Sequence, residues 1–345
     1  MPAIITNKFR LNNAEQFSES FSETANEVYY LGIGRPHPFG TATRPDGRTD
    51  YEGTDTLPNT PADSMGREFY TFDDLVAAKR IQSSDVSFVI PRRNWTAGTI
   101  YDTYRHDYGE YTTGSTSVRK TSNSGATTLF DSNFYVLSSA RNVYKCLDNN
   151  GGATSTDEPT GVSTSVISTN DSYKWKFMYT LSAAQQANFL STDFMAVSSN
   201  ANAQSDQSNV ISAAVDGSID VVKIKTPGSG GTNGTFTGIP IRGDGSGGVA
   251  TVVVSGGAVT SVTVTTPGTG YTFATISNSQ IVAAGATSLS GSELDVIIPP
   301  KGGHGANAQE ELGAFFVMMN TSLEGTESAN SVSYTHLRAH ETSLH

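Results

Sequence analysis

Apolar and polar residues alternate along several short stretches of this chain, which is the pattern of half-buried β-strands. The clearest stretch covers residues 173–181, where alternation places Tyr173, Trp175, Phe177 and Tyr179 on one face. Further strands are predicted at residues 28–33, 85–90, 134–137, 143–147, 249–254 and 315–319. The pattern therefore predicts a mainly β protein with some helix, an α+β fold built on a β-sandwich.

Helix signals are fewer and weaker. Asn13 has the residue type and position to cap an amphipathic helix. Thr71 with Asp74 resembles a capping box, which predicts a helix that ends at about residue 81. Residues 182–190 predict a short helix, and residues 40–68 predict a long loop rich in Pro, Gly, Asp and Thr.

The composition changes near residue 206, where Gly, Ser, Thr and Val begin to dominate. A short motif, Thr-Pro-Gly-Ser/Thr-Gly, occurs at 226–230 and again at 266–270, each time after an alternating strand. Pro followed by Gly suits a type II turn. We therefore predict an inserted all-β module over residues 206–298.

Residues 1–205 are expected to form an α+β domain to which the chain returns at residues 299–331. Residues 332–345 look like a translated sequencing-adapter tail, and we expect them to be non-native. On that interpretation the natural protein continues past residue 331, and the strand at 315–319 is underpacked in this fragment.

Charge and cysteine content exclude several classes of protein. The chain has 22 Lys and Arg against 33 Asp and Glu, a net charge of −11, which argues against a protein that wraps duplex DNA. No apolar run is long enough to span a membrane, so neither nucleic acid nor membrane is an expected partner. Cys146 is the single cysteine, which excludes an internal disulfide and a cysteine-built metal site.

Motifs that often carry chemistry have simpler interpretations here. The GxGxxG at 243–248 precedes a predicted strand instead of a helix, so we interpret it as a hairpin loop. The acidic pairs at 73–74, 157–158 and 310–311 could serve a glycosidase only at a suitable separation across a cleft. His304, between glycines, is expected to be a turn histidine bonded to the backbone. We expect no catalytic residue, cofactor or metal, and hence no enzyme.

Two groups of side chains are better candidates for structural anchors or for an interface. Arg92 and Arg93 precede Trp95 directly after a predicted strand. They could form an interface hot spot or clamp a loop carboxylate internally, and both alternatives stay open. Tyr104 and Tyr108 belong to a run of four tyrosines with helical spacing, which favours core packing.

Several segments together resemble one known family. They are Thr6-Asn7-Lys8-Phe9-Arg10, the corner at 33–36 that contains Arg35, the run at 89–95 with Arg92, Arg93 and Trp95, residues 143–148, 158–161 and 173–179, and the Gly-Gly-His-Gly at 302–305. These segments look like the gene-eight baseplate wedge subunits of T-even-like contractile-tailed phages, especially the marine, cyanophage-type members. The segment Ile-Pro-Arg-Arg-Asn-Trp is the most specific of them.

The resemblance implies a non-enzymatic, dimeric, mostly β protein that packs against other baseplate wedge subunits. It implies a place in the virion tail baseplate after synthesis in the bacterial host cytoplasm. The candidate interface or structural anchors are then Arg35, Arg92, Arg93, Trp95, Tyr104, Tyr108 and His304. The alternative is a carbohydrate-binding or adhesive tail-fibre-like protein, which would depend on Phe236, Tyr271 and Phe273 in the inserted module.

Overall fold

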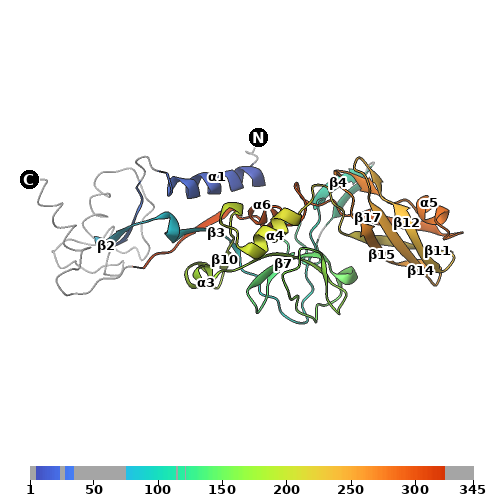
Figure 1. Cartoon of the computed structure of the whole chain (residues 1–345), viewed down its shortest axis with the longest axis horizontal. Coiled ribbons are helices and arrows are strands. Elements are labelled where there is room, and N and C mark those ends of the chain that lie inside the picture. The colour runs from blue at the N-terminus through green and yellow to red at the C-terminus, as the bar shows by residue number, and fades with distance from the viewer. Residues whose placement is uncertain (1–4, 24–27, 35–74, 114–115, 121, 323–345) are drawn as a thin grey trace, which may run out of the picture. The chain divides into compact units, whose positions relative to one another are not determined.

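The computed structural model describes residues 5–23, 28–34, 75–113, 116–120 and 122–322 (Figure 1). Within them, short antiparallel strands predominate and helices are few, so the predicted mainly β, α+β fold class is confirmed. The chain divides into two compact units, one of Met1–Glu15 with Ser87–Met318 and one of Gln16–Val86 with Met319–His345. No helix among the described residues is long and apolar enough to cross a membrane.

The larger unit is organised around a four-stranded antiparallel sheet in the order β6-β7-β9-β8. These strands are β6 (Tyr135–Leu137), β7 (Asn142–Asp148), β8 (Ile167–Ser168) and β9 (Lys174–Thr180). A second sheet has the order β10-β3-β18, from β10 (Phe194–Ala196), β3 (Val86–Pro91) and β18 (Phe316–Met319). A separate hairpin joins β4 (Gly109–Thr113) to β5 (Thr116–Lys120).

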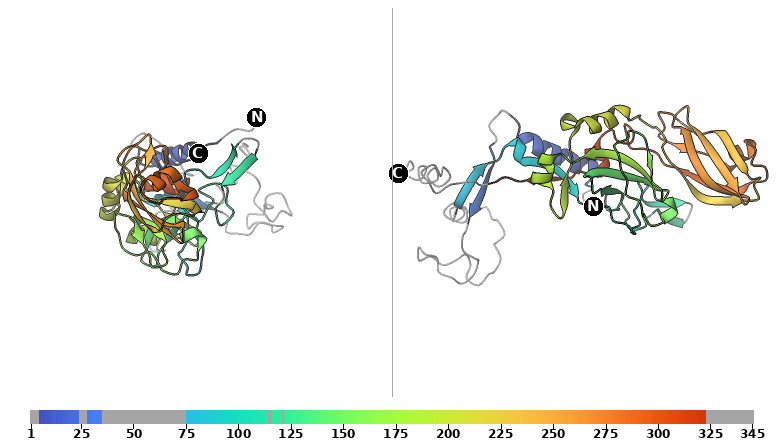
Figure 2. Two further views of the ribbon diagram at one scale, coloured as in Figure 1. Left: turned by 90° about the vertical axis from the view of Figure 1, so that its right-hand side faces the viewer. Right: turned by 60° about the horizontal axis from the view of Figure 1, so that its bottom comes forward.

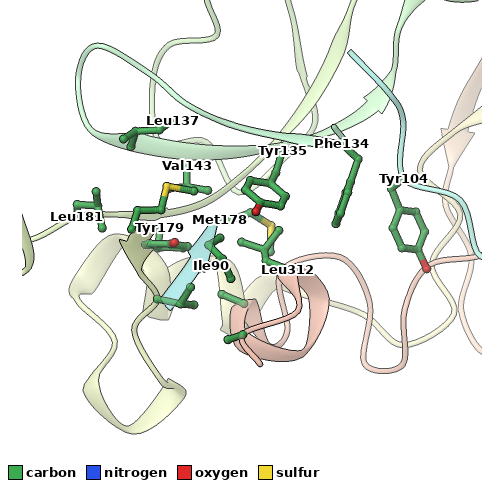
Figure 3. Packing of buried hydrophobic residues seen from close by; sticks show 14 of the residues in the cluster. Ile90, Tyr104, Phe134, Tyr135, Leu137, Val143, Met178, Tyr179, Leu181 and Leu312 are labelled. Atoms are coloured by element: carbon green, nitrogen blue, oxygen red, sulfur yellow. The ribbon is translucent and has the colours of Figure 1, made fainter. Parts of the chain in front are cut away.

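Both faces of the β6-β7-β9 region are buried. Val143 and Leu147 of β7 belong to one apolar cluster, together with Ile90, Tyr104 and Leu312 (Figure 3). The alternate residues of β7 belong to a second cluster with Tyr101, Tyr173 and Trp175. Burial on both faces explains why the sequence of these strands is nearly continuous in apolar and aromatic residues.

A β-bulge corrects one prediction about β9. Tyr144 pairs with Phe177 and Val143 pairs with Tyr179, so Met178 is an extra residue between the two pairs. The extra residue shifts the side-chain alternation, and Tyr179 joins the cluster of Val143 instead of the face of Phe177. The prediction that four aromatic residues share one face is therefore wrong for the last of them.

Residues 206–298 contain a third apolar cluster, whose members all fall between Ile219 and Val296. Its strands are β11 (Val222–Ser229), β12 (Gly234–Pro240), β13 (Arg242–Gly243), β14 (Val249–Ser255), β15 (Ala258–Thr266), β16 (Ala274–Thr275) and β17 (Ser290–Val296). They pair as β12-β14-β15, β11-β17 and β13-β16. Figure 2 shows these strands, in yellow to orange, from two further sides.

The two copies of the repeat differ in the structure. In the second copy β15 ends at Thr266, directly before Pro267 and Gly268, as predicted. In the first copy β11 continues instead through Pro227, which pairs with Ser292 of β17. Gly228 has a φ of +72°, and a Cβ there would lie 2.8 Å from the Ser290 carbonyl oxygen. The first Gly therefore admits a close strand contact where we predicted a turn.

Short helices connect the strands. They are α3 (Ala183–Phe189), α4 (Ser205–Ala213), α5 (Asn278–Ala283) and α6 (Ala308–Leu312), with the 3-10 turns η1 (Ser83–Asp85), η2 (Asn150–Gly152) and η3 (Asn200–Asn202). The helix predicted at 182–190 is confirmed as α3, and the Ser182 hydroxyl accepts from the Gln185 N–H at 3.1 Å. The loop predicted at 40–68 and the tail at 332–345 lie outside the described residues.

One helix prediction and one predicted helix start are wrong. Residues 75–80 form strand β2 (Leu75–Arg80) paired with β1 (Tyr30–Gly34), because the partner strand overrides a weak capping signal. Helix α1 (Asn7–Ser20) begins well before Asn13, since the Thr6 hydroxyl accepts from the Phe9 N–H at 3.2 Å. The tyrosines from 101 to 108, whose spacing is helical, lie in a segment without helix or strand; Tyr101 and Tyr104 are buried in different clusters, in agreement with the expected core packing.

Candidate functional site

Arg93 is held inside the larger unit. Its guanidinium lies over the Tyr135 ring, 4.6 Å from the centroid. The same group donates to the Ser132 carbonyl oxygen and, at 3.2 Å, to that of Phe130. A planar guanidinium can stack and donate at once, which a lysine cannot. Arg93 therefore connects the loop before β6 to the end of β3, as in the internal-clamp alternative, but its acceptors are carbonyls instead of a carboxylate.

The neighbours of Arg93 make similar contacts. Arg92 donates from its guanidinium to the Ser191 carbonyl at 2.8 Å and to the Asn94 side chain at 2.9 Å. The Trp95 indole N–H donates to the Ser155 hydroxyl at 3.1 Å. The segment 92–95 thus reaches several loops of the same unit, which favours the structural alternative over an interface hot spot. Arg35 lies outside the described residues.

The two candidate tyrosines also have internal partners. Tyr108 donates its hydroxyl to the Thr103 carbonyl at 2.7 Å, and burial raises the pKa of Tyr108 to about 12. Tyr104 is 5% exposed, and its ring contacts two other groups of interest, Lys145 and His304. Burial raises the pKa of Tyr104 as well.

The most unusual group of side chains in the described part of the chain surrounds Lys145, in the middle of β7. Lys145 is fully buried and forms an ion pair with Glu311 of α6, which is 4% exposed. The Lys145 ammonium also lies 4.9 Å from the centroid of the Tyr104 ring. Burial lowers the pKa of Lys145 despite its acidic partner. The pair joins residues that are 166 positions apart in the sequence.

A second lysine lies directly across the sheet. Lys176 of β9 pairs in register with Lys145, which places two like charges opposite each other. The Lys176 ammonium donates to the Thr164 carbonyl at 2.5 Å. Burial lowers the pKa of Lys176 and raises that of Asp220, and the opposite charges of these two groups partly offset both effects. The arrangement is a sealed cluster of charges on one face of the sheet.

His304 completes the cluster. Its ring meets the Tyr104 ring edge-on at 4.9 Å between centroids, and it is 4% exposed. Among the described residues its Nδ1 finds no hydrogen-bond partner, which differs from the backbone-bonded ring that we expected. Burial, followed by the charges of Lys145 and Lys176, lowers the pKa of His304 well below its ordinary value. The imidazole is therefore neutral near pH 7.

Residues 300–307, which we name the return loop, hold His304 in place. Glu311 accepts from the N–H groups of Gly305 and Asn307 at 2.8 and 3.1 Å. Gly303 has a φ of +94°, and a Cβ there would lie 2.4 Å from the Val215 carbonyl oxygen. A Cβ on Gly305 would lie 2.3 Å from a methyl group of Val210 in α4. Only glycine fits these close approaches.

Sequence reasoning selected His304 and Tyr104 but missed both lysines and Glu311. A signal was present, because Lys145 and Lys176 each interrupt a strand whose neighbours are apolar or aromatic. A charge at such a position predicts a buried partner. The sequence did not identify the partner, since Glu311 was considered only as part of the acidic pair at 310–311.

The side chains considered for a sugar platform, a glycosidase or a metal site differ in exposure and in partners. Phe236 is partly buried and Tyr271 is buried, with its hydroxyl bonded to the Ile241 carbonyl at 2.9 Å. Phe273, 64% exposed, is thus the single solvent-exposed ring of the three proposed for a sugar platform. In the acidic pair at 157–158, which we considered for a glycosidase, the Glu158 carboxylate accepts from the N–H and the hydroxyl of Ser139. In the described ranges, no group of three His, Cys, Asp or Glu could hold a metal ion.

Comparison with known proteins adds nothing to these contacts. No protein-family model matches the sequence. A search of curated proteins likewise finds no significant match.

Proposed function

We propose that the chain is a non-catalytic structural subunit of the baseplate wedge in a contractile phage tail. It would act by packing against other wedge subunits and against a second copy of itself, without a cofactor. The proposal starts from the resemblance of segments such as 89–95 and 302–305 to that family. It adds the mainly β fold and the contacts that those segments make.

One observation carries the proposal furthest. The segment from Arg92 to Trp95 is the most specific part of the resemblance. Its Arg92, Arg93 and Trp95 side chains donate hydrogen bonds to carbonyls and a side chain of their own unit. The second segment, around His304, packs against a buried ion pair. In both places the side chains that carry the resemblance stabilise the fold, as a load-transmitting subunit requires. A catalytic centre would instead keep reactive groups open to a substrate.

Reconstitution tests the proposal. The chain would be co-expressed with the wedge proteins encoded beside it, and complexes would be separated by size-exclusion chromatography and weighed by native mass spectrometry. We expect a defined complex that contains this chain and forms without added cofactor. A chain that stays alone with every neighbouring wedge protein, and that is missing from purified tails, would rule the proposal out.

Surface variants sharpen that test. Phe273 and Phe316 are exposed at 64% and 43%. Phe273→Ser should leave the melting temperature nearly unchanged, because an exposed ring contributes little to folding. Phe316→Ser should lower it slightly, because it removes an edge-on contact with the Phe194 ring. If either ring contacts a partner, its variant lowers complex formation by tenfold or more, about 1.4 kcal/mol. Ile100→Ser, at 43% exposure on a different segment, serves as the matched control.

A further inference from the structure

The return loop is closed over a histidine that has no acceptor for a second proton. His304 is buried, its Nδ1 is unpartnered, and its ring contacts Tyr104 instead of a carboxylate. The loop packs closely in this state, since a Cβ on Gly303 or Gly305 would clash with Val215 or Val210. The protonated His304 imidazole would have an N–H without an acceptor in the closed loop, so protonation becomes favourable only when the loop opens.

We propose that His304 makes the return loop an acid-released latch, which opens locally as His304 takes up a proton. This inference stands on the geometry of residues 300–312 and does not depend on the proposed function. Opening would free the loop from Asp216, whose carboxylate accepts from the Gly302 N–H at 2.6 Å, and from Asn200, which donates to the Ala306 carbonyl at 2.9 Å.

The charged groups around the return loop determine whether protonation of His304 favours the closed or the open state. From β7 and β9 it faces Lys145 and Lys176, and both repel a protonated imidazole. From α6 it faces Glu311, whose charge is engaged by Lys145 and by two N–H groups. From the segment before β11 come Asp216 and Asp220. Tyr104 is neutral, and α4 presents Val210.

The sign of the pH dependence follows from proton counting. Because the pKa of His304 is lowered in the closed state, the open state binds more protons below about pH 6.5. Acid therefore favours opening, by up to about tenfold per pH unit. The lowered pKa values of Lys145 and Lys176 act in the same direction. The raised pKa of Asp220 acts in the opposite direction, since the closed state holds that proton more firmly.

Hydrogen–deuterium exchange of the full chain tests the latch. Amide exchange in peptides covering 300–307 would be measured at about pH 6.5 and about pH 5 and corrected for the intrinsic chemical rate. We expect the opening constant to rise by up to about sixteenfold over this range, because an open-state imidazole with a pKa of about 6.5 is already half protonated at the higher pH. Amides of β7 and β9 should show no parallel change, because the event is local.

Variants separate His304 from other titrating groups. His304→Phe and His304→Gln should remove most of the acid-dependent opening, whereas His106→Gln should retain it, although it removes an exposed histidine that accepts from the Ile298 N–H. Asp220→Asn should enlarge the acid response. Equal opening at both pH values, unchanged acid opening in both His304 variants, or simultaneous exchange of β7 and β9 would overturn the latch. If neither variant folds, NMR titration of the wild-type ring decides, since a closed loop with His304 titrating near 6.5 would also overturn it.

Discussion

At the scale of single residues, the Lys145–Glu311 pair is the interaction whose loss should cost most. Lys145→Met leaves a buried carboxylate without its partner, and we expect the free energy of unfolding to fall by about 3–5 kcal/mol. Lys225→Met is the matched control, because the Lys225–Glu293 pair is 61% and 56% exposed and should contribute less than about 1 kcal/mol. Urea unfolding measures both changes.

The double variant Lys145→Met/Glu311→Leu tests whether the loss comes from the unpaired buried carboxylate. Apolar residues can replace a buried ion pair with little loss, so the double variant should recover most of the stability lost in Lys145→Met. A single variant that costs no more than the Lys225 control would show that the pair contributes little.

Arg93 allows a second test at this scale. Arg93→Lys keeps the charge but removes the planar group that stacks on Tyr135 and donates to two carbonyls. We expect a loss of about 2 kcal/mol in urea unfolding. Arg242→Lys, at an exposed position in β13, should change stability by less than about 0.5 kcal/mol. Equal effects of the two substitutions would contradict an anchoring role for Arg93.

At the scale of elements, the return loop depends on glycine for two different reasons that can be separated. Gly303 and Gly161 both have positive φ, +94° and +86°, but only Gly303 lies against another part of the backbone. Gly161→Ala should cost about 1 kcal/mol from backbone strain alone. Gly303→Ala should cost at least about 2 kcal/mol more, because its Cβ would clash with Val215. Thermal or urea unfolding of the two variants distinguishes strain from clash, and equal losses would refute the close approach.

The sequence predicted elements well where one signal was strong. Strands β3, β7 and β14 were located because apolar alternation or apolar runs are strong there. β2 was mistaken for a helix, because its pairing with β1 involves residues about 45 positions away and leaves no local mark. The register of β9 was also out of reach, since the bulge at Met178 depends on how β7 is paired.

The candidate site was less predictable than the strands. The residues beside His304 and Tyr104 in the sequence made both of them candidates. Their contact was not predictable, because it joins segments 200 residues apart. Lys145 and Glu311 are 166 positions apart, so the charge in the middle of β7 predicted a buried partner without identifying it. Burial converts such residues into a cluster, and burial is a property of the assembled fold.

At the scale of the whole molecule, the larger unit contains apolar clusters of distinct composition. The cluster between Ile219 and Val296 shares no member with the cluster around Val143. Val221 and Ile297, directly beside β11 and β17, belong to the cluster around Val143. Polar contacts add to this link, since Arg105 lies 2.5 Å from Asp295 and Lys223 donates to the Thr103 hydroxyl at 2.8 Å. Two apolar residues and such polar contacts contribute less to folding cooperativity than a fully shared apolar core.

We therefore expect the strands of residues 222–296 to open as a unit of their own. Ile239→Ala, at a fully buried position, should lower the opening free energy of β12, β14 and β15 by about 2–5 kcal/mol in native-state hydrogen exchange. The amides of β7 and β9 should keep their protection. Val143→Ala should show the reverse pattern with a smaller loss. If each substitution lowers protection equally in both regions, the polar contacts and the chain connections suffice to make residues 87–318 one cooperative body, as their grouping in a single compact unit would permit.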